Sequence, residues 1–300
     1  MTPNTRSLTS LPGVILIVFV AVSFAANSTL SKIAFDHGAT PLSLLTSRTA
    51  LAAISVFVIL KIWRVPIGLP FRVRWVAIGM GGIVALYSYS LMSALLYLPV
   101  ALAVLTFYLY PILTSLGSWA IGQERLTFRI LVCLITAFIG LGLALDIGGN
   151  INFVGISLAI GAAVGFTVLL LVNNNLGDGQ DSRPVSFHMM SSATLLFILM
   201  DMNAGGMPLP ASFQGIAAYI GSCVFFAFSM IGMFVGLAKI GAIRTSLLMN
   251  FEPVSSIALG ALLLDQVLEP LQLVGAGVVI AAILLAELVK NSSVKKSCIR

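Results

Sequence analysis

Ten apolar stretches, each close to the length of a membrane-spanning helix, occupy almost all of this 300-residue chain. A helix needs about 20 mostly apolar residues to cross the hydrocarbon core of a bilayer. The composition agrees, because 59% of the residues are hydrophobic and 9% are charged, far from the balance of a soluble domain. We predict an all-α polytopic membrane protein with ten transmembrane helices, near 13–35, 41–62, 75–97, 100–121, 128–147, 152–172, 185–201, 212–237, 242–264 and 270–289.

Lysine and arginine gather in alternate loops, and this asymmetry predicts the orientation. Cationic loops stay on the cytoplasmic side of a membrane. We therefore expect both termini in the cytoplasm, with the bilayer as the surroundings of the chain. The net charge of +6 reflects these loops. It does not indicate nucleic-acid binding, which would need a basic cluster on a soluble fold. The basic segments are 61–74, 122–129, 173–184 and 239–244 together with the C-terminal tail, whereas 36–40, 98–99, 148–151, 202–211 and 265–269 contain neither Lys nor Arg.

The second half of the chain repeats the first at an offset of 142 residues. Pro111 aligns with Pro253, and Phe24 aligns with Phe166, because 253 − 111 and 166 − 24 both equal 142. Five spans are an odd number, so the second copy must enter the membrane from the other side. We predict two inverted five-helix repeats, 1–147 and 148–300 with the tail, related by a pseudo-two-fold axis in the membrane plane.

The two aligned prolines interrupt the fourth and ninth spans. Proline lacks an N–H group and clashes with the carbonyl four residues before it, so a helix kinks or breaks there. The freed carbonyls belong to Phe107 and Met249. We predict that Pro111 and Pro253 are paired hinges of a rocking cycle. Static kinks that only shape the pathway are the alternative.

Few polar side chains lie at membrane depth, where each costs free energy and so faces the interior of the bundle. Glu252 and Asn250 lie in the ninth span, Arg48 in the second and Asn27 in the first. Glu252 is a candidate for proton coupling or for binding a substrate ammonium group, with a structural ion pair as the alternative. Arg48 is a candidate for binding a substrate carboxylate, with structural pairing or snorkelling to the surface as the alternative.

Aromatic side chains gather on the third, fourth and sixth spans. Tyr108 and Tyr110 lie deeper than an interfacial belt, and a wet cavity would satisfy their hydroxyl groups. Their directions differ by about 200° on a regular helix, so both can line one cavity only if Pro111 distorts the helix. Ordinary packing is the alternative for these rings and for Met230. The residues predicted to line a cavity are Asn27, Arg48, Tyr87, Tyr89, Met230, Asn250 and Glu252.

These motifs resemble the drug/metabolite transporter superfamily, in particular its ten-helix EamA-type exporters. The matching pieces are Pro41 with Arg48, Tyr110-Pro111 followed by Gly122-Gln123-Glu124, and Glu252-Pro253 followed by Asp265. The segment 107–111 is similar to the fourth helix of aromatic amino acid exporters. This similarity implies that Tyr108, Tyr110 and Phe166 line the cavity. The resemblance implies a central cavity between helices 1–4 and 6–9, with helices 5 and 10 standing apart.

The resemblance implies a secondary transporter that exports small metabolites by alternating access across the inner (plasma) membrane of a bacterium. Amino acids, aromatic ones included, are the favoured small-molecule substrate. Broad-specificity export of lipophilic cations or drugs is one alternative, and transport of phosphorylated metabolites such as nucleotide sugars is another. Both a monomer and a homodimer are compatible with the sequence.

The sequence contains no constellation typical of an enzyme. His37 lies in a predicted loop and His188 lies near the start of the seventh span, and neither belongs to a metal-ligand or nucleophile motif. Cys133 and Cys223 lie inside helices, and Cys298 lies in the tail, which does not indicate a disulfide framework. We therefore expect no catalytic site, no cofactor and no bound metal.

Overall fold

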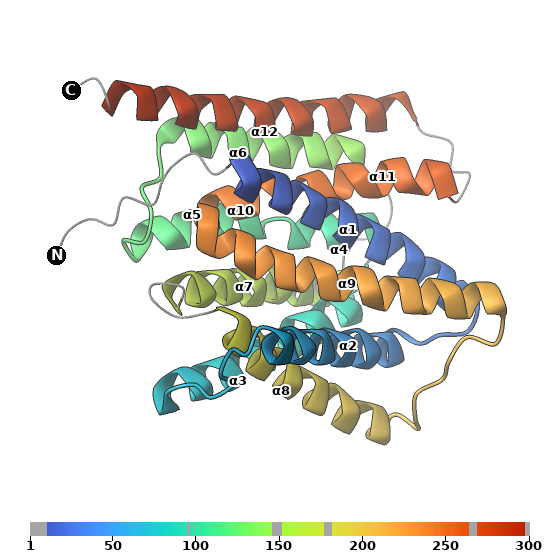
Figure 1. Ribbon diagram of the computed structural model, residues 1–300. Coiled ribbons are helices and arrows are strands. Elements are labelled where there is room, and N and C mark those ends of the chain that lie inside the picture. Colours follow the sequence, from blue (N-terminus) through green and yellow to red (C-terminus); the bar gives the residue numbers. More distant parts are fainter. Residues whose placement is uncertain are drawn as a thin grey trace.

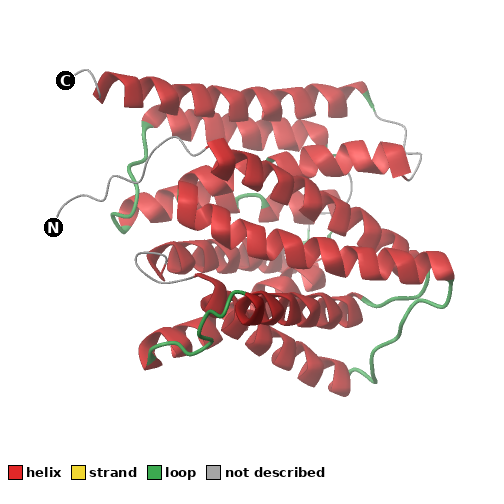
Figure 2. Ribbon diagram, viewed as in Figure 1, coloured by secondary structure: helices red, strands yellow, loops and turns green. Residues whose placement is uncertain are grey.

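The structure is a computed structural model, and it describes residues 11–94, 97–98, 100–145, 152–176, 182–263 and 269–297. Within these ranges the regular structure is entirely helical, as Figure 2 shows. The helices are α1 (Leu11–Asp36), α2 (Pro41–Ile62), α3 (Phe71–Ala94), α4 (Val100–Phe107), α5 (Tyr110–Ala120), α6 (Phe128–Ala144), α7 (Phe153–Leu176), α8 (Ser182–Asn203), α9 (Phe213–Ile240), α10 (Ala242–Leu248), α11 (Phe251–Leu263) and α12 (Pro270–Ser297).

Each predicted span corresponds to one helix or to two consecutive helices. In the described part of the chain, seven helical segments are long and apolar enough to cross a membrane, and one of them joins α4 and α5. The helix α6 and the first part of α12 are shorter apolar segments. The consecutive helices α10 and α11 make up the remaining span. The prediction of an all-helical membrane protein with ten spans is confirmed.

Hydroxyl side chains begin three of the helices at the loops that precede them. The Thr40 side chain accepts a hydrogen bond from Ser43 N at 3.2 Å, and Pro41 takes the first helical position of α2. Ser212 plays the same part for α9, accepting from Gly215 N at 3.1 Å. These caps satisfy N–H groups that a helix start leaves free, and so they fix where the helices enter the bundle.

The fourth and ninth spans both break immediately before the aligned prolines. The first break separates α4 from α5 at Tyr108 and Leu109, and the second separates α10 from α11 at Met249 and Asn250. The predicted distortion at both prolines is therefore confirmed. Their role as moving hinges stays a prediction.

The second break is stabilised by the side chain next to it. Asn250 Nδ2 donates to the Ser246 carbonyl at 3.3 Å and to the Leu247 carbonyl at 3.0 Å. These carbonyls lie in the last turn of α10, where a helix leaves carbonyls without their regular backbone partners. The Leu247 carbonyl also accepts from the backbone N–H of Asn250 at 3.1 Å. The amide thus replaces part of the backbone hydrogen bonding that the break removes.

Helix contacts follow the pseudo-two-fold relation that the repeat predicts. The pair α1–α9 has the pair α3–α7 as its equivalent, and the pair α2–α9 corresponds to α3–α8. Two pairs, α2–α8 and α6–α12, join helices that are equivalent to each other, and the pair α5–α10 joins the equivalent fourth and ninth spans. All of these pairs connect the two halves, so the core is built between the repeats rather than within each of them.

The helices α6 and α12 pack mainly against each other, at one edge of the bundle in Figure 1. Gly140 of α6 and Gly275 of α12 allow this close approach, because a Cβ atom at Gly140 would lie 3.0 Å from the Gly275 carbonyl oxygen. The remaining helices surround the aromatic residues described below. The fifth and tenth spans are α6 and α12, and their separate position agrees with the family resemblance.

Replacing Gly275 by alanine should destabilise the protein, because the new Cβ would lie 2.8 Å from the Ala144 Cα atom. Overpacking of this kind costs about 1–3 kcal/mol. Thermal unfolding in detergent should therefore show a lower midpoint for Gly275→Ala. Gly277→Ala is the matched control, because a Cβ at Gly277 meets nothing within 4 Å. Equal midpoints for the two variants would contradict the close approach of α6 and α12.

Candidate functional site

Five aromatic rings from α3, α4, α5, α7 and the first helix break meet inside the bundle. We call Tyr87, Phe107, Tyr108, Tyr110 and Phe166 the aromatic cluster. The Phe166 ring centroid lies 4.7 Å from that of Tyr110, 5.2 Å from that of Tyr87 and 5.6 Å from that of Phe107. The Tyr108 ring completes the cluster at 6.0 Å from Phe107. Four of the five rings were predicted to line one cavity, and the structure brings those four together.

The helix break is what allows both tyrosines of the fourth span to join the cluster. On a regular helix, residues 108 and 110 would point about 200° apart. The α4 helix ends at Phe107 and α5 begins at Tyr110, so Tyr108 lies in the break. The ring centroids of Tyr108 and Tyr110 are 5.7 Å apart. The required distortion before Pro111 is present, and it places both rings on one side.

A glycine on α7 makes room for the Tyr87 side chain. A Cβ atom at Gly165 would lie 2.9 Å from the Tyr87 Cβ atom, which is closer than two side chains can approach. The absence of a side chain therefore lets α7 pack closely on α3. Phe166, the next residue along α7, then reaches the Tyr87 ring.

Glu252 and Arg48 bring opposite charges to the same region. The Tyr108 hydroxyl donates a hydrogen bond to the Glu252 carboxylate. Arg48 interacts electrostatically with Glu252 and with Tyr87. Its Cζ atom lies 4.3 Å from the centroid of the Phe226 ring, in the geometry of a cation–π contact. The arginine thus contacts an aromatic face and interacts electrostatically with the carboxylate.

Two buried donors in this region have no hydrogen-bond partner among the residues that the structure describes. They are Arg48 Nε and the Tyr110 hydroxyl. Buried polar groups nearly always have a partner, because leaving one unpaired costs about 1–3 kcal/mol. The arrangement therefore leaves two buried donors that could bind an acceptor group.

Tyr89 does not belong to this site, and its prediction as a cavity-lining residue is wrong. Its side chain is 50% exposed, whereas Tyr87 is 8% exposed. Side chains two positions apart on a helix point in nearly opposite directions, and the helix α3 turns Tyr87 towards the interior of the bundle. Tyr89 therefore faces the outer, lipid-facing surface of the bundle.

Asn27 and Asn250 have structural partners rather than positions in the aromatic cluster. Asn27 Oδ1 accepts from the Ser222 hydroxyl at 2.8 Å, and Ser31 bonds to the same Ser222 hydroxyl at 2.8 Å. This buried network ties α1 to α9. Asn250 caps the end of α10, as described above. Met230, 1% exposed, lies in the main hydrophobic core together with the cluster.

Phe107 and Phe226 are absent from the predicted set although they contact its central members. Phe107 packs against Tyr110 with a centroid distance of 5.3 Å, and Phe226 lies under Arg48. Phe107 could have been found, because it is the residue whose carbonyl Pro111 frees. Phe226 precedes Met230 by one helical turn, so the same face of α9 carries both.

The other members of the fourth-span motif, Gln123 and Glu124, form a second group of contacts. We call the end of the bundle that carries Lys61, Arg125 and Lys239 the basic end. There, Glu124 Oε1 accepts from Ala242 N and from Ile243 N, the latter at 3.2 Å.

Gln123 extends the contacts of the basic end to α7. Its Nε2 atom donates to the Leu171 carbonyl at 2.9 Å, and its Oε1 atom accepts from Asn174 Nδ2 at 3.0 Å. Together with the Glu124 contacts, these bonds join α5 to two helices of the second half. We call the bonds of Gln123 and Glu124 the basic-end latch.

Replacing Glu124 by alanine should loosen the latch, because the first N–H groups of α10 lose their acceptor. Losing such a cap costs about 0.5–2 kcal/mol. In a background without the native cysteines, a Ser246→Cys side chain on buried α10 should then react several-fold faster with a membrane-impermeant maleimide. Glu269→Ala, which removes an exposed carboxylate elsewhere, is the control. An unchanged reaction rate in Glu124→Ala would show that the latch does not hold α10.

Comparisons with known proteins give a consistent family. A model of the EamA-like transporter family matches residues 11–145 and matches again over residues 153–288. The threonine/homoserine exporter RhtA of Escherichia coli K12 is 25% identical over 285 residues, which are 91% of this chain and 90% of that protein.

Two further proteins resemble the chain. The uncharacterized transporter sll1319 of Synechocystis is 25% identical over 225 residues, covering 73% of this chain and 68% of that protein. A protein of known crystal structure superposes with a TM-score of 0.74 at 18% identity, over 94% of this chain and 100% of the other. At this identity the superposition supports the fold alone.

Proposed function

The chain belongs to the EamA-like transporter family, and on that premise we propose that it exports amino acids, aromatic ones included, by alternating access. Family membership makes the protein a multi-pass membrane transporter of small molecules rather than an enzyme. The relative from E. coli is named as an exporter of threonine and homoserine, which supports an amino acid as cargo.

The observation that carries this proposal is the position of Arg48 and Glu252, which interact electrostatically beside the aromatic cluster. An amino acid carries a carboxylate, an ammonium group and a side chain. A guanidinium group recognises the carboxylate through charge-assisted hydrogen bonds. The Glu252 carboxylate would receive the ammonium group, and the rings would pack against the side chain. Without substrate, the two charges compensate each other.

The contacts of Arg48 suit such a role. Its guanidinium lies against the Phe226 ring, and its Nε atom has no hydrogen-bond partner among the described residues. The unpartnered Tyr110 hydroxyl, which also interacts electrostatically with Glu252, supplies a second donor. We propose that both donors bind the substrate carboxylate, while Tyr108 holds Glu252 in position.

Alternating access would follow from the repeat. We propose that the two halves rock against each other, with the breaks at Pro111 and Pro253 as hinges. The basic end faces the cytoplasm under the positive-inside rule. The latch of Gln123 and Glu124 then closes the cytoplasmic side, and its release would admit substrate from the cytoplasm.

Export of lipophilic cations is the second candidate, favoured by Glu252 lying beside aromatic rings, which bind organic cations well. A lipophilic cation as cargo would leave Arg48 without a function in binding. A phosphorylated cargo would need several cations, whereas the described part of the site contributes Arg48 alone. These differences make the choice of cargo testable.

Counterflow in liposomes that contain the purified protein tests the proposal. Liposomes loaded with unlabelled phenylalanine or threonine should accumulate the labelled amino acid from outside, with saturation and mutual competition. Accumulation of a lipophilic cation such as labelled tetraphenylphosphonium, with no amino acid counterflow from folded protein, would overturn the proposed cargo. Empty liposomes provide the baseline.

Replacing Arg48 by glutamine should weaken amino acid binding about 10-fold or more, because a hydrogen bond to a charged group contributes about 1.5–3 kcal/mol. Phenylalanine should therefore become a weaker competitor of transport. Phenethylamine, which lacks the carboxylate, should compete as in the wild type. Arg72→Gln removes an exposed cation and serves as the control. Equal losses for both competitors would show that Arg48 does not bind the carboxylate.

Replacing Glu252 by glutamine should abolish any response of transport to an imposed pH gradient, because the variant has no ionisable group at that position. The wild type should transport faster when the gradient is imposed, and the variant should transport at one rate with or without it. Glu269→Gln, an exposed carboxylate, should respond like the wild type. A Glu252→Gln variant that keeps the wild-type pH response would rule out Glu252 as the proton-coupling group.

A further inference from the structure

Asp201 is a buried carboxylate at the end of the bundle opposite to the basic end. It lies in the last turn of α8 and is 2% exposed. The Thr46 hydroxyl on α2 donates to Asp201 Oδ2. The other carboxylate oxygen, Oδ1, is buried and has no hydrogen-bond partner among the residues that the structure describes. A carboxylate rarely occurs buried without a paired charge or a full set of donors.

The loop that follows Asp201 folds back over it. Ala204 N and Gly206 N donate to the Asp201 carbonyl at 3.1 and 3.0 Å. Gly205 and Gly206 adopt φ values of +93° and +111°, which glycine allows without strain. The Pro208 carbonyl then accepts from the Ser43 hydroxyl on α2 at 3.0 Å. The loop is thereby fastened to the first turn of α2.

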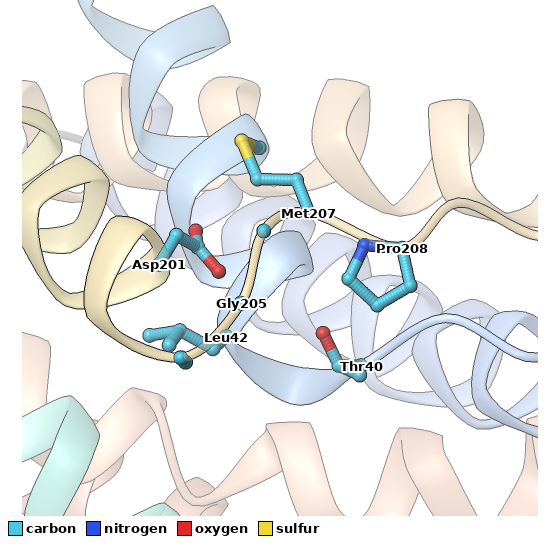
Figure 3. Close-up of a pocket in the computed structure, with 8 residues that line it drawn as sticks. Thr40, Leu42, Asp201, Gly205, Met207 and Pro208 are labelled. Atoms are coloured by element: carbon cyan, nitrogen blue, oxygen red, sulfur yellow. The ribbon is translucent and has the colours of Figure 1, made fainter.

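A pocket of about 480 Å³ lies between this loop and α2. Figure 3 shows the Asp201 carboxylate pointing into the space between Leu42, Thr40 and Pro208. The described side chains that line the pocket carry one negative charge and no positive charge. Tyr219 on α9 is the neighbouring titratable group, and its hydroxyl is engaged with the Ser43 carbonyl at 2.8 Å and with Ser47 Oγ at 2.7 Å.

This lining suits a primary ammonium group better than a bare metal ion. A Ca²⁺ or Mg²⁺ ion needs about six oxygen ligands, whereas the lining side chains with oxygen atoms are Asp201 and Thr40. An ammonium group needs a few acceptors and one negative charge. The apolar atoms of Leu42 and Met207 leave room for the carbon skeleton attached to it, and the volume lies within the range of small-molecule sites.

We propose that this pocket is an outer cation site, at which the ammonium group of the departing substrate binds to Asp201 after it leaves Glu252. The identity of the cargo as an amino acid rests on the proposed function, whereas the ammonium site does not. The helix α2 connects the two sites. Thr46 contacts Asp201, and Arg48, two residues further along α2, contacts Phe226 of the central region.

Transport measured from each side of the membrane tests the proposal. In right-side-out vesicles, which present the outer face, Asp201→Asn should raise the KM for uptake about fivefold or more, because one charged hydrogen bond contributes more than 1 kcal/mol. In inside-out vesicles the KM should change less than about twofold. Asp36→Asn removes an exposed carboxylate at the same end of the bundle and should change neither value. Equal changes from both sides, or none from the outer side, would overturn the site.

A second variant tests the pocket even if Asp201→Asn does not fold. Met207→Trp keeps the carboxylate and fills the pocket from a position that is 41% exposed. It should reproduce the change in KM on the outer side alone. An unchanged outer-side KM in a folded Met207→Trp protein would contradict the pocket as the binding place.

Thermal unfolding with ethylammonium chloride tests the site without relying on amino acid transport. Ethylammonium should raise the unfolding midpoint of the wild type by about 2 °C or more at saturating concentration and should leave Asp201→Asn unchanged. Sodium chloride and tetramethylammonium chloride, which have no N–H donors, should not stabilise either protein. Equal stabilisation by all three salts, or none by ethylammonium, would overturn the ammonium site. Because no cargo is involved, this result is independent of the proposed function.

Discussion

Backbone groups inside a bilayer must find partners within the protein, and the architecture depends on how the two broken spans meet this demand. An unsatisfied peptide group in hydrocarbon costs several kcal/mol. At the second break, the Asn250 side chain donates to carbonyls of α10 and supplies part of the lost bonding. At the first break, Tyr108 and Tyr110 turn to the same side. Among the described spans, these two breaks are where irregular backbone lies beside the aromatic cluster. The first break places Tyr108 and Tyr110 in the cluster.

The inverted repeat explains the shape of the candidate site, and its departures from symmetry explain the chemistry. Position 110 in the first half is equivalent to position 252 in the second, because 252 − 110 equals 142. The first half has Tyr at this position, and the second half has Glu. Likewise Tyr108 is equivalent to Asn250. The pseudo-two-fold axis thus sets an aromatic wall opposite a carboxylate, and this asymmetry suits a substrate with one apolar part and one charged part.

Hydropathy predicted the spans well because lipid forces apolar residues onto every outward-facing surface. The second span, 41–62, agrees with α2 at both ends, since Thr40 and Pro41 mark its start. The last helix extends to Ser297, beyond the predicted end at 289, because helix formation continues after the apolar pattern stops. Asp265 and the predicted boundary between 147 and 148 lie outside the described residues.

Side-chain positions were harder to predict than spans, for two physical reasons. Membrane depth did not distinguish Tyr87 from Tyr89, because only the packing of α3 against α7 decides which ring faces inward. Asp201 resembled an ordinary charged helix end, and its burial depends on a loop that returns over it to Ser43. The short helix α10 is also positioned by contacts between segments that are far apart in the sequence. Glu124 holds its first N–H groups and Asn250 caps its end, two residues before Glu252. Under the proposed function, a change at Glu252 on substrate binding would therefore act on α10, and through α10 on the basic-end latch.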